Sequence, residues 1–169
     1  MKIKVKIDQR LMTLFGTAVA NHIRERTLEG KDKDGKPFKQ YSTISFAMPS
    51  GAMTQVALKA LEKGGNLTWF TTKSGSEWVI VKGGYKKYKE VAKPKSKNVN
   101  LSFKGTMLAD LTLINVNDDS ISIGFNRSEE AQKAVWNIER GRDFFGIEDD
   151  ELSKLGENLL PGVDVDIEE

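Results

Sequence analysis

The chain has 169 residues, of which 38% are hydrophobic and 30% charged, and it contains no cysteine. This composition suits one folded domain, and it excludes a disulfide framework, a catalytic thiolate and a zinc-thiolate site. The net charge of +2 hides an asymmetry, because residues 148–169 hold nine acidic side chains and one lysine, a net charge of −8, so that the rest of the chain carries +10. Such an asymmetry can keep a protein soluble, or steer one end of a subunit to another end of its neighbour.

The first third of the chain predicts a strand and two helices. Residues 2–7 alternate lysine with isoleucine or valine, which is typical of a strand with one face in water and not of a secretory signal or a membrane span. Asp8 can cap a long amphipathic helix that reaches about Leu28. Residues 54–63 predict a second helix, ended by two glycines. The apolar face of the long helix is expected to contain Leu11, Leu14, Phe15, Ala18, Val19 and Ile23.

Between these helices lies a segment rich in turn residues, Gly30 to Pro37, followed by a short apolar stretch at 42–48 whose type the pattern leaves open. The aspartates of the turn segment invite comparison with a calcium loop. A third acidic ligand and the closing glutamate of an EF-hand are missing, so the sequence does not predict a calcium site.

Residues 67–72 and 77–82 predict a β-hairpin, and its aromatic residues favour cross-strand packing over ligand stacking. Residues 82–97 contain seven lysines, one glutamate and two tyrosines. Lysines can neutralise phosphates while tyrosines stack on bases, but a solvated helix followed by a linker at Pro94 explains the composition equally well. The absence of arginine from this stretch gives no support to bidentate phosphate recognition. The hairpin aromatics are Trp69, Phe70 and Trp78.

The next stretch predicts a strand at 99–103, a short helix at 106–110 and an antiparallel hairpin formed by 111–117 and 120–125. The expected turn of this hairpin is Asp118-Asp119. Its second strand leads directly into the last part of the chain, 128–160.

Residues 128–160 predict a helix, a glycine-arginine turn, a phenylalanine pair and a second helix. Ser128 is the expected N-cap of the first helix, and Gly141 is its expected left-handed stop. The acidic run at 148–151 suits the positive end of the second helix. Phe144 and Phe145 are interpreted as a core plug under the two helices, with the alternative that one of them anchors a partner. The apolar face of the first helix is expected to contain Ala131, Ala134, Val135 and Ile138.

No pattern in the chain predicts catalysis. The single histidine, His22, falls within the first amphipathic helix, where packing or surface exposure explains it. The chain contains no nucleophile elbow, zinc-protease helix or dinucleotide-binding glycine motif. We therefore expect no enzyme, no cofactor and no metal.

Together these elements predict an α+β fold in which a mostly antiparallel sheet is packed by a long N-terminal helix and C-terminal helices. The expected organisation is a single domain over residues 1–162, with a basic loop or insert region at about 82–98 and an acidic tail at 163–169.

Several separated pieces, taken in order, resemble the virion morphogenesis and tail-completion proteins of tailed bacteriophages, also described as head-tail joining or neck proteins. The resemblance spans about residues 10–160, with 44–74 the least familiar part, and neither the lysine-rich stretch nor the acidic tail has a counterpart. The pieces are the amphipathic helix, Gly-Lys-Asp…Asp-Gly-Lys-Pro-Phe…Tyr-Ser at 30–42, Trp-Val-Ile-Val…Gly-Gly-Tyr at 78–85, Asn-Leu-Ser-Phe-Lys-Gly-Thr-Met-Leu-Ala-Asp-Leu at 100–111, and Gly-Arg-Asp-Phe-Phe-Gly-Ile at 141–147.

The resemblance implies a structural protein of the virion, assembled in the host bacterial cytoplasm, that forms a ring, commonly sixfold, between the neck and the tail tube. Its expected partners are further copies of itself and the tail-tube and neck proteins, with nonspecific contact to DNA in the channel and none to a membrane. A DNA-associated protein that uses the basic stretch is the alternative.

A ring subunit needs two different complementary surfaces. We expect the acidic end of the chain to approach basic residues of a neighbouring subunit, with apolar burial supplying most of the affinity, because exposed ion pairs contribute only about 0–1 kcal/mol each. The interface candidates are Arg142, Phe144, Phe145, Glu148, Asp149, Asp150, Lys86, Lys87 and Lys89.

Overall fold

The computed structural model describes residues 9–93, 99–102, 104–117 and 120–159. The chain forms two compact units. The terminal unit combines residues 1–38 with 100–169, and the inserted unit is Lys39–Val99. Each unit combines helices with its own antiparallel sheet, which confirms the predicted α+β class. The sequence predicts one domain with a basic loop or insert region at about 82–98. In the structure the inserted unit begins earlier, at Lys39, because a strand at 46–49 pairs with a strand at 77–81 inside this unit.

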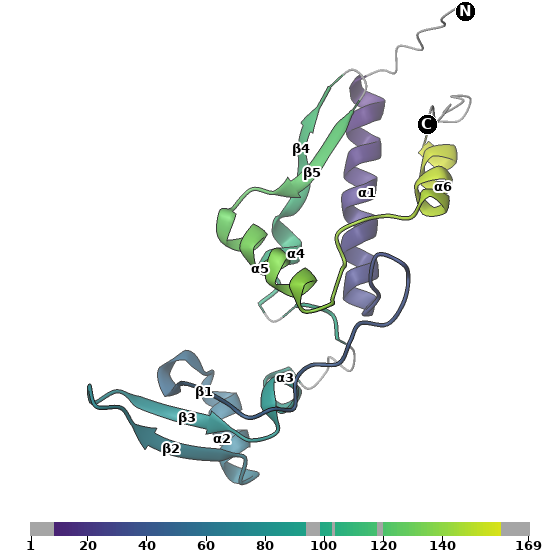
Figure 1. The fold of residues 1–169 in the computed structure, drawn as a ribbon. Coiled ribbons are helices and arrows are strands. Elements are labelled where there is room, and N and C mark those ends of the chain that lie inside the picture. The colour runs from purple at the N-terminus through teal and green to yellow at the C-terminus, as the bar shows by residue number, and fades with distance from the viewer. Residues whose placement is uncertain (1–8, 94–98, 103, 118–119, 160–169) are drawn as a thin grey trace, which may run out of the picture. The chain divides into compact units, whose positions relative to one another are not determined.

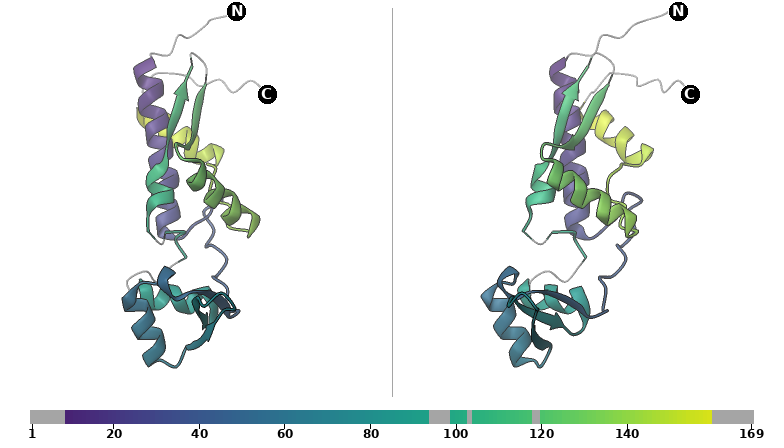
Figure 2. Two further views of the ribbon diagram at one scale, coloured as in Figure 1. Left: turned by 90° about the vertical axis from the view of Figure 1, so that its left-hand side faces the viewer. Right: turned by 60° about the vertical axis from the view of Figure 1, so that its left-hand side comes forward.

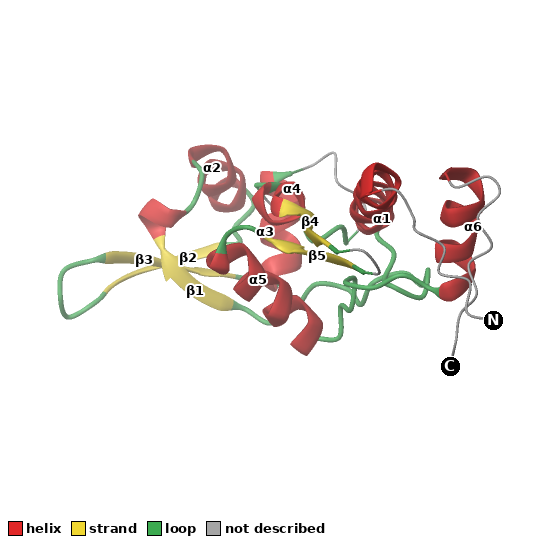
Figure 3. Ribbon diagram, turned by 90° about the horizontal axis from the view of Figure 1, so that it is seen from above, coloured by secondary structure: helices red, strands yellow, loops and turns green. Residues whose placement is uncertain are grey.

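The terminal unit is built around the long helix α1 (Gln9–Glu29), as Figure 1 shows. The hairpin of β4 (Leu111–Val116) and β5 (Ile121–Phe125) packs along one side of α1. Helix α6 (Asp149–Leu159) packs on another side, so that α1 lies between the hairpin and α6 (Figure 3). The short helix α4 (Thr106–Asp110) precedes β4, and α5 (Ser128–Glu139) follows β5 and packs against α4.

Because α1 has neighbours on two sides, its buried face differs from the predicted one. The predicted residues Val19 and Ile23 are buried, but Leu14 is 59% exposed. Gly16 lies against the hairpin, where a Cβ atom would meet Leu113 Cδ1 at 2.6 Å, so the absence of a side chain permits this close approach. The remaining buried residues of α1 are Met12, Ala20, Arg26 and Thr27.

The inserted unit contains a three-stranded antiparallel sheet in the order β1-β3-β2. Its strands are β1 (Phe46–Pro49), β2 (Leu67–Thr71) and β3 (Glu77–Val81), and the last two form the predicted hairpin. The apolar stretch of undecided type therefore supplies β1. A 3-10 turn, η1 (Ser50–Ala52), leads to α2 (Gln55–Lys63), and α3 (Gly84–Ala92) follows β3; Figure 2 shows α2 on one side of the sheet.

The two faces of this sheet differ because side chains alternate along each strand. One face contains the fully buried Val79 and Val81, and α3 covers it through Phe46, whose ring centroid lies 6.4 Å from those of Tyr85 and Tyr88. The strand register places the alternate residues of all three strands on the opposite face, where each side chain is exposed or half-buried. We call this opposite face the sheet surface, and it consists of Ala47, Pro49, Thr68, Phe70, Trp78 and Ile80.

Several predicted elements are confirmed, and the structure defines the residues at which they begin and end. Thr54 caps α2 by accepting a hydrogen bond from Ala57 N at 3.3 Å. The hairpin β4–β5 is antiparallel, and Asn117 N donates to Ser120 O at 2.8 Å across its turn. Gly141 has a φ of +73°, the left-handed conformation expected after a helix. The predicted strand at 2–7, Asp8, Asp118-Asp119 and the acidic tail lie outside the described residues.

Two predictions for the second half of the chain are wrong. No strand forms in the described residues 99–102, because Leu101 has a φ of +51° and Ser102 N donates to Asn100 Oδ1 at 3.3 Å, a local turn that competes with extended backbone. Ser128 is not the N-cap of α5 but its first residue. Arg127 is the N-cap, and its amide donates at 2.9 Å to the carboxylate of Asp110 at the end of α4.

Replacing Gly84 with alanine should destabilise the inserted unit. Gly84 has a φ of +69°, and a Cβ atom there would meet the carbonyl oxygen of Ser42 and lie 2.6 Å from the carbonyl carbon of Thr43. The left-handed conformation alone costs a residue with a side chain about 1–2 kcal/mol. In urea denaturation, Gly84→Ala should lose at least that amount, whereas Gly51→Ala, with open space around its Cβ position, should stay within about 0.5 kcal/mol of the wild type. Equal stability of the two variants would contradict this packing.

Candidate interaction surfaces

The C-terminal segment of the terminal unit is fixed to α1 by one buried arginine. Arg26 is 5% exposed, and its Nη2 donates to the backbone oxygens of Phe144 at 3.2 Å and Gly146 at 2.6 Å. Its Nη1 donates to Glu151 Oε2 at 2.7 Å, in the first turn of α6. One guanidinium thus holds the phenylalanine pair and the start of α6 against the end of α1.

Two more contacts complete this clamp. His22 Nε2 lies 3.0 Å from Glu151 Oε2, so the histidine has the helix-packing position that the sequence predicts. Burial alone would raise the pKa of Glu151, but the hydrogen bond and charge of His22 and the charge of Arg26 outweigh it and hold this pKa below its ordinary value of 4.5. Lys33 N also donates to Asp143 O at 2.8 Å, which joins the turn segment after α1 to the glycine-arginine turn.

The clamp gives the two phenylalanines different surroundings. Phe144 is fully buried, as expected for a core plug. Phe145 is 38% exposed, and its ring centroid lies 5.9 Å from that of Phe125 at the end of β5. Phe144 is therefore ruled out as an exposed anchor, and Phe145 stays a candidate. Arg142 is also ruled out as a surface contact, because it is only 8% exposed.

Helix α5 has an unusual distribution of side chains. Its buried residues are Glu130 and Ala134, whereas Val135 is 45% exposed, Trp136 is 49% exposed and Ile138 is 36% exposed. The sequence predicts Val135 and Ile138 on the apolar face of this helix, and its pattern gives no sign of the exposed Trp136. We call these three exposed residues the α5 surface.

Charge pairing explains why Glu130 turns inward. Its Oε1 accepts a hydrogen bond from Lys133 Nζ at 2.9 Å, and Arg127 Nη2 lies 3.5 Å away. The hydrogen bond with Lys133 lowers the pKa of Glu130 despite its burial. Arg127 also donates from Nε to Asp110 Oδ1 at 2.9 Å, so charged groups join α4 to α5. The large apolar side chains of α5 are exposed.

The acidic candidates lie at the start of α6. Glu148, Asp149 and Asp150 are all exposed, and Glu148 O accepts the hydrogen bond of Leu152 N at 2.9 Å. Carboxylates at this end favour the helix dipole, so their position has a structural explanation as well. They remain available to a cationic partner.

The basic candidates of α3 are not equivalent. Lys86 is exposed, and Lys87 Nζ lies 3.6 Å from Glu90 Oε2. Lys89 is only 3% exposed; its ammonium donates to Tyr41 Oη at 2.7 Å and lies 4.6 Å from the centroid of that ring. Lys89 therefore stabilises the inserted unit and is not a surface contact, which corrects its prediction as an interface residue.

The sheet surface of the inserted unit was not predicted as a site. The rings of Phe70 and Trp78 pair across β2 and β3 with centroids 6.2 Å apart, as expected for cross-strand packing. Phe70 is nevertheless 39% exposed. The signal in the sequence was the aromatic content of the hairpin, but only the strand register shows that these residues share a face with Pro49.

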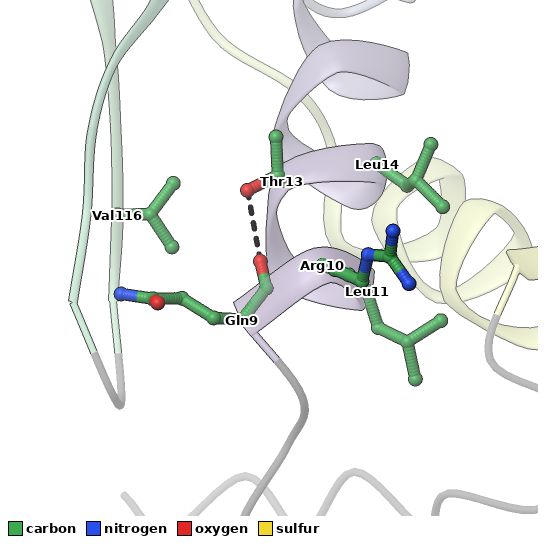
Figure 4. A pocket seen from close by; sticks show the side chains of 6 residues that line it. All are labelled: Gln9, Arg10, Leu11, Thr13, Leu14 and Val116. Carbon is green, nitrogen blue, oxygen red and sulfur yellow. Dashed lines mark hydrogen bonds between the residues drawn. The ribbon is translucent and has the colours of Figure 1, made fainter.

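An open hollow of about 700 Å³ lies at the start of α1. Figure 4 shows Gln9, Thr13 and Val116 toward the hairpin, with Arg10, Leu11 and Leu14 on the other side of the helix. Thr13 Oγ1 donates to Gln9 O within the helix at 2.8 Å. Because ligand sites enclose most of a small molecule, we assign no ligand to this shallow hollow.

Within the described ranges, no cluster of three or more histidine, cysteine or carboxylate side chains could hold a metal ion. In the same part of the chain, no helix is both long and apolar enough to cross a membrane. Comparison of the chain with protein-family models, curated proteins and solved structures found no match.

Removing the Arg26 guanidinium should strongly destabilise the terminal unit. Arg26→Met keeps an unbranched side chain but leaves the two carbonyls and the Glu151 carboxylate without their donor, and leaving a buried acceptor unsatisfied costs about 1–3 kcal/mol. Arg140→Met, at an exposed position, should change the free energy of unfolding by no more than about 0.5 kcal/mol. Chemical denaturation measures both, and a small effect of Arg26→Met would refute its role as the clamp.

The lowered pKa of Glu151 predicts a loss of stability in acid. Since the folded-state pKa lies below the ordinary value of 4.5, the ionised group stabilises the fold above that pH, and this contribution disappears as pH falls through the folded-state value. Urea denaturation between about pH 6 and pH 3 should show a smaller acid-induced loss for Glu151→Gln than for the wild type. Asp150→Asn keeps the Arg26 contact and should therefore keep the loss; identical pH profiles for all three proteins would contradict the prediction.

Proposed function

We propose that the protein is a structural protein of a tailed-bacteriophage virion, which assembles as a ring at the neck end of the tail and completes the tail for head joining. The phage assignment is supported by the resemblance of its ordered sequence pieces to tail-completion proteins. Assembly would take place in the cytoplasm of the host bacterium, and the finished position would be the neck or tail of the virion.

The observation that carries the proposal is that α5 buries one carboxylate, Glu130, and exposes three large apolar side chains. A helix normally buries its apolar side chains and exposes its charged ones. Here Glu130 is 1% exposed, whereas Trp136 is 49% exposed. Aromatic side chains are enriched at protein interfaces, so contact with another protein accounts best for the exposed Trp136 and its apolar neighbours.

The contact between the turn segment and the glycine-arginine turn also supports the proposal. Both segments belong to the pieces that carry the resemblance, although more than a hundred residues separate them in the chain. They meet through the 2.8 Å hydrogen bond from Lys33 N to Asp143 O, and Arg26 holds the second segment. Because the two segments contact each other in the fold, a shared structural role explains why both of them are part of the resemblance to tail-completion proteins.

DNA association through the basic stretch is the weaker alternative. Of the candidate lysines on α3, Lys89 is buried and Lys87 lies beside Glu90, which leaves Lys86 as the most accessible. Binding would show as an affinity for duplex DNA that falls steeply with salt, since each neutralised phosphate releases counterions.

Mass photometry and negative-stain imaging test the proposal directly, with the purified protein alone and mixed with phage tails that lack their completion protein. Rings in solution, or a cap at one end of the tail tube, are the expected result. A strict monomer that does not bind tails at any concentration would overturn the proposal.

The two phenylalanines should separate folding from assembly. Phe144→Ala removes a fully buried ring and should cost about 3–5 kcal/mol of stability. Phe145→Ala should leave the melting temperature of the monomer close to that of the wild type and reduce assembly, because its ring is partly exposed. A thermal melt paired with mass photometry distinguishes the two effects, and full assembly by Phe145→Ala would remove this residue from the interface.

A further inference from the structure

The sheet surface is an apolar face without a charged side chain of its own. Its six residues include Phe70, which is 39% exposed, and Trp78 beside it at a centroid distance of 6.2 Å. An exposed aromatic ring with a half-buried one beside it favours contact with another apolar surface, because burying them further removes apolar area from water. The α5 surface, with Trp136 and Val135, is a second apolar surface in the same chain.

The two units that carry these surfaces have opposite charges. Lys39–Val99 contains eleven lysines, three glutamates and neither arginine nor aspartate, which gives the inserted unit a net charge of +8. Since the whole chain carries +2, the terminal unit carries −6. Copies of the chain therefore attract each other best when the inserted unit of one faces the terminal unit of another.

We propose that the sheet surface of one copy docks on the α5 surface of the next copy. This inference rests on the proposed function and specifies which surfaces close the ring. The contact is heterologous, because two different surfaces meet, and a heterologous contact repeats around a ring until the rotation closes it. The exposed carboxylates at the start of α6 and the lysines of the inserted unit contribute to orientation, while the apolar residues supply the affinity.

A second copy fits the sheet surface better than nucleic acid does. Nucleic-acid grooves combine stacking aromatic rings with cations that follow the phosphates. None of the six residues of the sheet surface is a cation. The buried Lys89 contacts Tyr41 on the other side of the sheet, where α3 lies. The lysines of the inserted unit are therefore absent from the sheet surface itself, and the core of a protein interface is likewise poor in charged residues.

Two variants, each defective in one surface, test the docking. The sheet variant is Phe70→Ser combined with Pro49→Ser, and the helix variant is Val135→Ser combined with Trp136→Ser, all at exposed positions. Matched controls are Val56→Ser on α2, where the residue is 72% exposed, and Ile114→Ser on β4, where it is 49% exposed. Circular dichroism and thermal melts first establish that each protein is folded.

Mass photometry then gives the assembly state of each protein and of an equimolar mixture. Each variant alone should be monomeric, with the dissociation constant of the subunit contact raised about tenfold or more, and both controls should form rings. The mixture should form dimers and nothing larger, because the intact sheet surface of one variant meets the intact α5 surface of the other and both outer surfaces are defective.

Other outcomes overturn the inference in distinguishable ways. If the wild type forms rings and either variant still does, the docking surfaces are wrong and the proposed function stands. A mixture that stays monomeric would exclude the pairing of these two surfaces. If the sheet variant assembles normally but loses affinity for single-stranded DNA, the sheet surface binds nucleic acid. A wild type that remains monomeric with and without tails would remove both the inference and the proposed function.

Discussion

The terminal unit depends on the buried guanidinium of Arg26. It is almost the last side chain of α1 that faces inward, and its three hydrogen bonds reach the segment that carries the phenylalanine pair and the first turn of α6. The two terminal nitrogens of this buried cation are matched by these three acceptors, so the positions of Phe144, Gly146 and Glu151 are fixed together. In the segment held in this way, Phe144 is fully buried and the next residue, Phe145, is 38% exposed.

A second arginine performs the corresponding task for the middle of the chain. Arg24 donates from Nε to Leu108 O at 2.8 Å and from Nη2 to Leu111 O at 2.7 Å, and so joins α4 and β4 to α1. Since the inserted unit separates α1 from α4 in sequence, these contacts return the chain to the same helix after the insertion. Two arginines near the end of α1 thereby position the segment of α4 and β4 and the segment that leads into α6. Helix α5 lies between these segments in the chain, and its large apolar side chains are exposed.

The local elements were predictable where one interaction dominates. The helical pattern at 54–63, Gly141 after a helix, and alternating residues on both sides of a turn each correspond to a local preference of the backbone, and the structure has the elements they predict. The predicted strand at 99–103 failed for the same kind of reason. The side chain of Asn100 competes for the backbone there, and the pattern of apolar residues does not reveal that competition.

The sequence by itself determined the α+β class, the long first helix, both hairpins and the acidic start of α6, because these depend on side-chain periodicity and turn chemistry within a few residues. Only the tertiary structure decided which candidate side chains are accessible. Lys89 looks like the lysines around it, yet Tyr41 and the packing of α3 bury it. Glu130 looks like a surface carboxylate, yet partners at Lys133 and Arg127 hold it inside and leave Trp136 outside. The burial of Lys89 depends on Tyr41, 48 residues away in the chain, and periodicity carries no information about such a partner.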